Sequence, residues 1–256
     1  MRDVAELLVR VLNSQGGWWE LESLRALLGS EARFSKALGY DFGPDPRRPE
    51  YAFLATDVTA AYGGMVRDAK RSFVFLNLGA QGIAGALVTF DLIVTADTAQ
   101  RVEWLIQDLE KPELRGSPFS GDLRLGERKW RLESRTLSSK RASAETLFLN
   151  LLQFVDPEAA TPLPAGEVSS VELAGVRLAD RVVLFHADTT SARGAVSFSV
   201  TGDGTLKYLV TGLAPGTWEV WWNGWLEDPQ GFVDLKAGAL YFQGPAGSYF
   251  LRRRGV

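Results

Sequence analysis

From Tyr51 onward, apolar residues recur at every second position, and this pattern constrains the fold more than any other feature of the sequence. Such alternation is typical of strands that bury one face. The segments between them are too short for the amphipathic helices that a parallel βαβ sheet requires. The sequence therefore predicts a mainly β fold with antiparallel sheets. The expected strands are 51–58, 71–78, 85–96, 101–109, 128–137 and 145–155 in a first group, and 180–187, 195–202, 205–212, 217–224, 231–237, 239–244 and 248–253 in a second.

Two interruptions of the pattern divide the chain into three parts. Residues 1 to about 40 have apolar residues at helical spacing, and the Gly- and Pro-rich connector 39–50 follows them. A second Pro-rich stretch, 156–167, separates the two groups of strands. We expect an antiparallel β-sandwich of two β-modules with a short helical N-terminal segment. The expected parts are a helical segment and linker over 1–50, an antiparallel β-sheet or sandwich domain over 51–160, and a small β-sandwich over 161–256.

Composition excludes several functional classes. The formal net charge is −3, so the chain has no overall basic field with which to bind nucleic acid or an anionic membrane. The chain has no cysteine, which excludes disulfides and thiolate metal sites, and its single histidine excludes a zinc site built from several histidines. We therefore expect no metal, no cofactor, no nucleic-acid partner and no membrane partner. Tight turns, such as Gly-Asp-Gly at 202–204, Ala-Pro-Gly at 214–216 and Asn-Gly at 223–224, are expected to join the later strands as hairpins.

The cellular compartment stays open at this level. The first residues carry several charges and lack the apolar stretch and cleavage site of a signal peptide. No segment approaches the roughly 18 consecutive apolar residues of a membrane-spanning helix.

Few titratable side chains stand out. His186 ends an apolar strand, where a lone histidine is typically a packed or edge residue, although imidazole suits general acid or base catalysis. Asp57 and Asp91 also lie in apolar strands, where a buried carboxylate is costly unless it is paired. We expect them to be structural, with Arg67 or Arg71 as ion-pair partners.

One strand carries a basic face. In 128–137, the side chains of Lys129, Arg131, Glu133 and Arg135 alternate with apolar residues and fall on one side. Guanidinium groups there could bind a carboxylated or sulfated sugar. The alternative is the solvated outer face of a half-buried sheet.

A segment that begins at Tyr51, YAFLATDVTAAYGGMVRDAKRSFVFLN, contains Asp57, Thr59, Ala61 and Tyr62 in the order D-x-T-x-A-Y, followed by KRSFVFL. It resembles the β-sheet portion of heparinase II/III-like polysaccharide lyases. The segments ALVTFDLIVTAD and VEWLIQDLEKPEL resemble the next two strands of that family. The segments from DRVVLF to SYFLRR are similar to the small β-sandwich that often closes such chains. The resemblance extends to the end of the chain.

The resemblance implies the fold of the family's β-sheet region for this sequence, but it supplies no catalytic centre. Lyases of the family cleave uronate-containing polysaccharides by β-elimination, and most of their catalytic residues, including a tyrosine and a histidine, lie in an N-terminal α/α toroid. A further histidine precedes the D-x-T-x-A-Y element. This sequence has no histidine upstream of Asp57, and about 50 residues cannot form the many paired helices of a toroid. No catalytic residue is therefore carried over. The family is typically periplasmic or secreted.

Three functions remain open. The leading hypothesis is a non-catalytic β-sandwich module of a heparinase II/III-like polysaccharide lyase, which supports an upstream α/α toroid catalytic domain or contacts acidic polysaccharide. The alternative is an active lyase, for which Tyr62 and His186 are the weak catalytic candidates. The third is a purely structural or assembly module, in which the helical N-terminus contacts a partner.

The run TWEVWWNGW, 217–225, concentrates tryptophans in one strand and its turn. Period-two alternation assigns Trp218 and Trp222 to the core and Trp221 to the opposite face. Asn223-Gly224 is expected to form the hairpin turn, with Trp225 beginning the return strand. Trp221 and Trp225 are the candidates for stacking on sugars, and packing against a neighbouring domain is the alternative.

Overall fold

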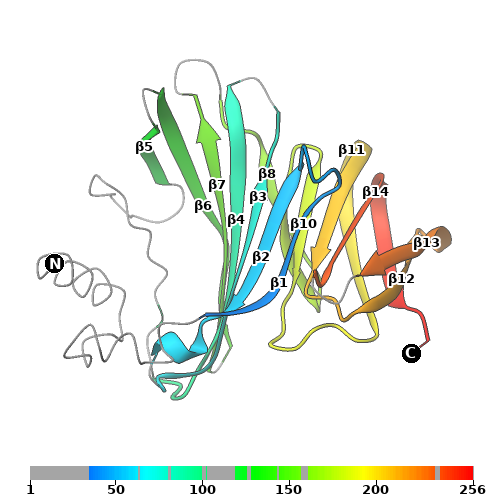
Figure 1. Ribbon diagram of the computed structural model, residues 1–256, viewed down its shortest axis with the longest axis horizontal. Helices are drawn as coiled ribbons and strands as arrows, with labels where there is room; N and C mark the ends of the chain where they lie inside the picture. The colour runs from blue at the N-terminus through cyan, green and yellow to red at the C-terminus, as the bar shows by residue number, and fades with distance from the viewer. Residues whose placement is uncertain are drawn as a thin grey trace, which may run out of the picture.

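The computed structural model shows a mainly β protein, as the sequence predicts, with two seven-stranded sheets in its described part (Figure 1). The structure describes residues 35–62, 64–79, 82–99, 102, 119–125, 128–142, 144–156, 161–233 and 237–255. For 119–125, 128–142 and 227–233 the description covers the backbone. Residues 1–34 of the expected helical segment, and nearly all of the expected strand 101–109, lie outside the described residues.

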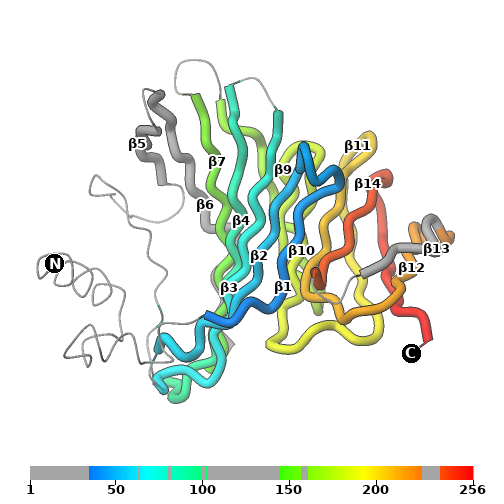
Figure 2. The backbone as a smooth tube through the Cα atoms, viewed as in Figure 1, coloured from blue at the N-terminus to red at the C-terminus, as the bar shows by residue number. Residues whose placement is uncertain are grey.

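The first sheet, called sheet A, is antiparallel throughout, and β1 to β4 run side by side in it (Figure 2). Its strand order is β1-β2-β3-β4-β7-β6-β5. A 3-10 turn, Thr59–Tyr62, follows β2. The strands are β1 Lys36–Gly43, β2 Tyr51–Asp57, β3 Val66–Leu76, β4 Ile83–Thr95, β5 Phe119–Leu125, β6 Arg128–Ala142 and β7 Glu145–Val155.

The second sheet, called sheet B, has the order β13-β12-β14-β11-β10-β9-β8. Its pairs are antiparallel except β10 with β11, which run parallel, so this sheet is mixed. The strands are β8 Ala165–Ser169, β9 Leu173–Leu178, β10 Arg181–His186, β11 Ala195–Thr211, β12 Gly216–Trp222, β13 Trp225–Val233 and β14 Ala239–Arg253.

Three expectations about the early chain and the turns are wrong. Ala214-Pro215-Gly216 joins β11 to β12, which are not neighbours in sheet B, so it is not a hairpin turn. Lys36–Gly43 is a strand paired with β2, rather than the end of a helix and a connector. Gly202-Asp203-Gly204 is not a hairpin turn, because β11 runs through it as one strand of 17 residues. The three residues form an irregularity between Val200 and Thr205 in the pairing with β14. Positive φ at both glycines, 138° and 77°, therefore accommodates a bulge.

The main core lies between the sheets. Tyr51 and Phe53 of β2 point inward together with the alternate residues of β3, β4 and β7, and they meet side chains from β9, β10 and β11. Phe90 of β4 stacks on Phe185 of β10, with ring centroids 5.0 Å apart. Both sheets contribute to one cluster. Separating the sheets would therefore expose the apolar inner faces of both to water.

A second core lies on the other face of sheet B. Val168 of β8 and Trp218 of β12 belong to the same buried cluster, although four strands separate β8 from β12 in the sheet order. Sheet B must therefore curl until its two ends enclose the cluster. Stacked rings fill the interior, including Tyr208 on Phe242 at 4.8 Å between centroids.

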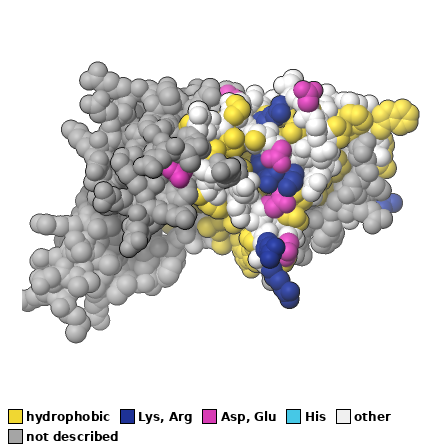
Figure 3. All heavy atoms as spheres, turned by 90° about the horizontal axis from the view of Figure 1, so that it is seen from above, with side chains coloured by type: hydrophobic (Ala, Val, Ile, Leu, Met, Phe, Trp, Pro, Cys, Tyr) yellow, Lys and Arg dark blue, Asp and Glu magenta, His cyan; other side chains and the backbone are white. Residues whose placement is uncertain are grey.

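An ionic cluster joins the sheets at one end of the sandwich. The Glu50 carboxylate, just before β2, lies 2.6 Å from Lys207 Nζ and 3.3 Å from Arg181 Nη2 of sheet B. Arg181 also pairs with Asp180. Figure 3 looks onto the molecule from this side, where basic and acidic side chains are intermingled. Because positive and negative side chains alternate here, they connect the two sheets without creating a strongly positive or negative surface.

Candidate functional site

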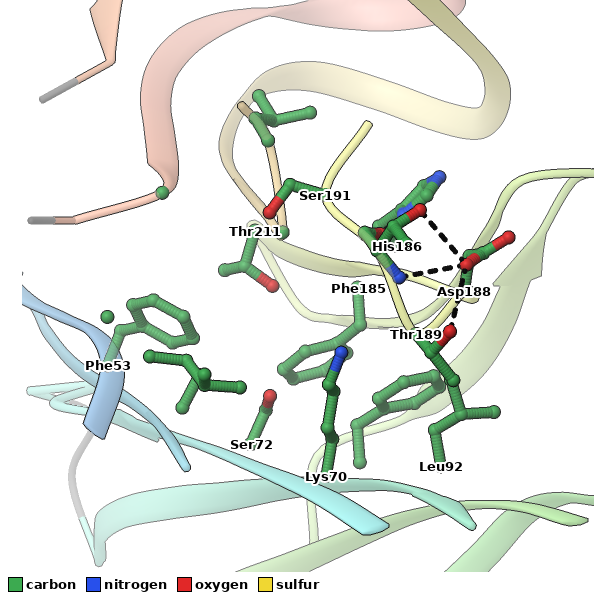
Figure 4. A pocket seen from close by; sticks show the side chains of 18 of the residues that line it. Phe53, Lys70, Ser72, Leu92, Phe185, His186, Asp188, Thr189, Ser191 and Thr211 are labelled. Atoms are coloured by element: carbon green, nitrogen blue, oxygen red, sulfur yellow. Dashed lines mark hydrogen bonds between the residues drawn. The ribbon is translucent and has the colours of Figure 1, made fainter. Parts of the chain in front are cut away.

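A small pocket opens between the two sheets and holds the only histidine of the chain (Figure 4). Its volume is about 100 Å³. Lys70 and Ser72 reach into it from β3, and His186 with the loop that follows β10 lines the other side. Aromatic rings, among them Phe53 and Phe185, form the apolar part of the wall. Pockets that bury a drug-sized ligand usually have roughly 300 Å³ or more, so this pocket is small by comparison.

The loop after β10 is held by local hydrogen bonds. His186 Nδ1 lies 2.9 Å from the carbonyl oxygen of Thr190, and because a carbonyl oxygen only accepts, this nitrogen donates the hydrogen bond. The Asp188 carboxylate accepts hydrogen bonds from the Thr190 backbone N–H at 2.8 Å and from the Thr190 hydroxyl at 3.2 Å. The backbone hydrogen bond from Thr190 is the main cause that lowers the pKa of Asp188, and the charge of His186 acts in the same direction.

Tyr62 lies apart from this pocket. It belongs to the 3-10 turn after β2 and packs against a separate apolar cluster formed by Val66, Ala69, Ile93 and Phe148. It is absent from the pocket wall that contains His186. The two weak catalytic candidates are therefore not brought together in one pocket.

Of the two acidic residues of the early strands, Asp91 has one of the expected arginine partners, whereas Asp57 is held by Thr59 rather than by Arg67 or Arg71. Asp91 is buried and pairs with Arg71, the second of the two predicted partners. Burial opposes the charge of Arg71, but the neighbouring Asp91 carboxylate outweighs it and raises the arginine's pKa. Asp57 accepts a hydrogen bond from the Thr59 backbone N–H at 2.9 Å. Its pKa is lowered, because the bonds from Thr59 outweigh its partial burial.

The basic candidates lie in β6. The backbone places Arg131 opposite Val155 and Arg135 opposite Leu151, with Lys129 opposite Arg124 of β5. Their side chains lie outside the described part of the structure, so a basic sugar-binding face on β6 stays a prediction.

The tryptophan run divides as the alternation predicts. Trp218 is fully buried and its indole N–H donates to the Ala214 carbonyl, and Trp222 packs against the same core. Asn223 and Gly224 form the turn, both with positive φ. Trp221 lies on the opposite face and is half-buried. Trp225 is 75% exposed and lies opposite Trp222 in the hairpin, so it is not on the face of Trp221.

The surroundings of Trp221 include residues that the sequence analysis did not single out. The Arg252 guanidinium lies 5.7 Å from the centre of the Trp221 ring and forms an ion pair with Glu219. Phe250 of β14 is directly opposite Trp221. Alternation within 248–253 could have indicated that Phe250 and Arg252 share a face. Only the register between β12 and β14 shows that Phe250 and Arg252 lie on the same face of sheet B as Trp221.

No group of three or more metal-binding side chains occurs among the described residues. The same part of the chain has no helix of sufficient length and apolarity to cross a membrane.

A comparison with known families concerns sheet B. Residues 167–253 match the heparinase II C-terminal domain. The match runs from β8 to the end of β14, and it is consistent with the heparinase II/III-like C-terminal region to which the sequence shows resemblance. No curated protein matches the chain. The matched residues thus include most of the curled sheet B, the buried cluster that it encloses and the face that carries Trp221.

Proposed function

We propose that this chain is a non-catalytic β-sandwich module of heparinase II/III-like type that supports an α/α toroid catalytic domain. The observation that carries the proposal is the outer face of sheet A at β1, β2 and β3, where large apolar side chains remain exposed in the described part of the structure. A face of this kind is typical of a surface that packs against another domain.

The exposed side chains form one patch. Tyr40 and Phe42 of β1, Leu54 of β2 and Phe75 of β3 are 39% to 52% exposed. Tyr40 is paired with Leu54, and Phe42 and Phe75 both pair with Ala52, so the four lie on adjacent strands. Alternation places them opposite Tyr51, Phe53 and Val74, which face the core. We call these four residues the β1–β3 patch.

The match of residues 167–253 to the heparinase II C-terminal domain favours a toroid as the partner that covers the β1–β3 patch. The domain is named for a lyase, and the resemblance in the first strands implies that the catalytic groups of such lyases lie mainly in a helical toroid. Helices with an apolar stripe could bury the β1–β3 patch. The same contact would fix the position of sheet A relative to the catalytic groups.

The alternative, an active lyase, requires a base and a site for a uronate. Tyr62 and His186 do not share a pocket, and the pocket of His186 has a volume of only about 100 Å³. These observations support a module without catalysis of its own. A second candidate function, contact with an acidic polysaccharide, is favoured by Arg252 lying over the Trp221 ring.

The experiment for the catalytic part of the proposal is a turnover assay of the purified chain on heparin, alginate and polygalacturonate. We expect no absorbance from unsaturated uronate. Any such turnover would overturn the proposal, and turnover that survives His186→Ala but is lost in Tyr62→Phe would identify Tyr62 as the base.

A further inference from the structure

One row of residues crosses the outer face of sheet B. In the pairing of four neighbouring strands, Ser197 of β11, Phe250 of β14, Trp221 of β12 and Leu226 of β13 lie opposite one another in turn. Neighbouring strands are about 4.8 Å apart, so the row extends over roughly 14 Å. We call it the Trp221 row. Its length suits several consecutive sugar rings.

The row offers apolar surface to the solvent. Phe250 and Leu226 are each 43% exposed, and Trp221 between them is partly exposed. Tyr249 and Leu251, the neighbours of Phe250 along the strand, are buried on the other side, so the row is the outward face of a well-packed strand. The Trp221 indole N–H lies 3.4 Å from a Glu219 carboxylate oxygen, which holds the ring in place. A fixed aromatic ring of this kind loses little conformational entropy when it stacks on a ligand.

Positive charge borders the row. Arg252 Nε and Nη2 lie 3.2 Å and 2.7 Å from the same Glu219 oxygen, and the guanidinium is half-exposed beside Trp221. Arg254 is also exposed and close enough for its charge to act on Glu219. Two arginines therefore face one glutamate at this border. Arginine forms forked hydrogen bonds with carboxylates, so an anion beside the ring would be favoured.

We propose that the Trp221 row and Arg252 form a binding surface for a polysaccharide whose sugars carry carboxylates. The sugar rings stack on Trp221 and Phe250, and Arg252 contacts a carboxylate. The Ser197 hydroxyl at the end of the row provides a hydrogen-bonding group for a sugar hydroxyl. This inference rests on the second candidate function, contact with an acidic polysaccharide, and assigns that contact to a surface of sheet B. The β1–β3 patch is a different surface, so either one can fail its test without the other.

The test is titration calorimetry of the chain with polygalacturonate oligosaccharides at low salt. We expect binding to the unmodified chain, and a loss of affinity on the order of tenfold in Trp221→Ala and in Phe250→Ala, because each removes stacking area. Trp225→Ala is the matched control: its ring is more exposed but lies on the other face, so its affinity should be unchanged. Absence of binding, or a loss in Trp225→Ala as large as in Trp221→Ala, overturns the proposal.

A second arm examines the charge. Arg252→Gln should weaken binding of the carboxylated oligosaccharide several-fold and reduce its dependence on salt, while Arg48→Gln, an exposed arginine outside the row, should change neither. Neutral dextran tests for affinity that comes from ring stacking alone, and dextran sulfate tests for affinity that comes from any negative charge. Equal affinity for neutral dextran contradicts the role of Arg252, and binding of dextran sulfate without polygalacturonate contradicts a carboxylate ligand. Circular dichroism of each variant checks folding, and Phe250→Leu replaces Phe250→Ala if the latter unfolds.

Discussion

Phe90 of sheet A and Phe185 of sheet B stack face to face, with ring centroids 5.0 Å apart and ring planes inclined by only 2°. Both rings are buried, and they join sheet B, which holds the residues that match the heparinase II C-terminal domain, to sheet A. The two sheets therefore share a core rather than merely touching. A module whose parts are fixed in this way can hold a partner domain at a defined position.

The shared core predicts the cost of removing one of these rings. Phe185→Ala should lower the free energy of unfolding by about 3–5 kcal/mol, because it removes stacking and leaves a cavity between the sheets. Urea denaturation followed by tryptophan fluorescence measures this. Phe250→Ala, at an exposed position, should cost about 1 kcal/mol or less. Similar losses in the two variants would contradict a shared core.

The tryptophan run predicts a second contrast in stability. Trp218→Ala should cost about 3–5 kcal/mol, since the ring is fully buried and its N–H has a buried partner, the Ala214 carbonyl. Trp221→Ala should leave folding largely intact, with a loss of about 1 kcal/mol or less. Trp222→Ala should lie between them, because that ring is only partly buried. Thermal denaturation of the three variants gives the ranking, and equal losses would be inconsistent with the assigned faces.

Tyr51 makes stability dependent on alkaline pH. Burial, together with the hydrogen bond that its hydroxyl donates to Asp41 at 2.7 Å and the charge of that carboxylate, raises the pKa of Tyr51. In the unfolded chain a tyrosine ionises near pH 10. Between that pH and the higher pKa of the folded state, the unfolded chain binds fewer protons, so stability falls as the pH rises. The contribution of Tyr51 is thus fully present below about pH 10 and is lost above it.

The comparison of unmodified protein with Tyr51→Phe isolates this effect. At about pH 8 the variant should be less stable by about 1 kcal/mol, because the hydrogen bond to Asp41 is lost. Urea denaturation from about pH 8 to pH 11 should then show a shallower decline in the variant than in the unmodified protein. Parallel profiles would mean that Tyr51 does not titrate as described.

Turn prediction from residue type was correct where the residues favour one backbone conformation. Asn223-Gly224 forms the expected turn, since both residues tolerate positive φ, and the strands on either side pair as a hairpin. The same rule was wrong for Gly202-Asp203-Gly204, because positive φ suits a bulge within a long strand as well as a turn. Pairing of β11 with β14 on both sides of the bulge decides between them, and this pairing depends on residues about 40 positions away.

Features that depend on non-local pairing could not be predicted. Within the edge strand β1 only Gly39 and Gly43 are buried, so the strand lacks the alternation of a half-buried strand. Its glycines and its bulge make the segment resemble a connector. The parallel pairing of β10 with β11 requires knowledge of the whole sheet order. The sequence singled out Trp221, but its partners Phe250 and Arg252 became visible only through the register of β12 with β14.

The most direct test of the central claim is the affinity of the purified chain for the isolated α/α toroid domain of a heparinase II/III-like lyase from the same organism, measured by light scattering and calorimetry. The account predicts a defined complex, which Phe42→Lys or Tyr40→Lys weakens by about tenfold or more, because each places a charge in the β1–β3 patch. Phe250→Lys, an equally exposed position on sheet B, should leave the affinity unchanged. No complex with the toroid, or equal weakening by Phe250→Lys, would contradict the proposed support of a catalytic domain.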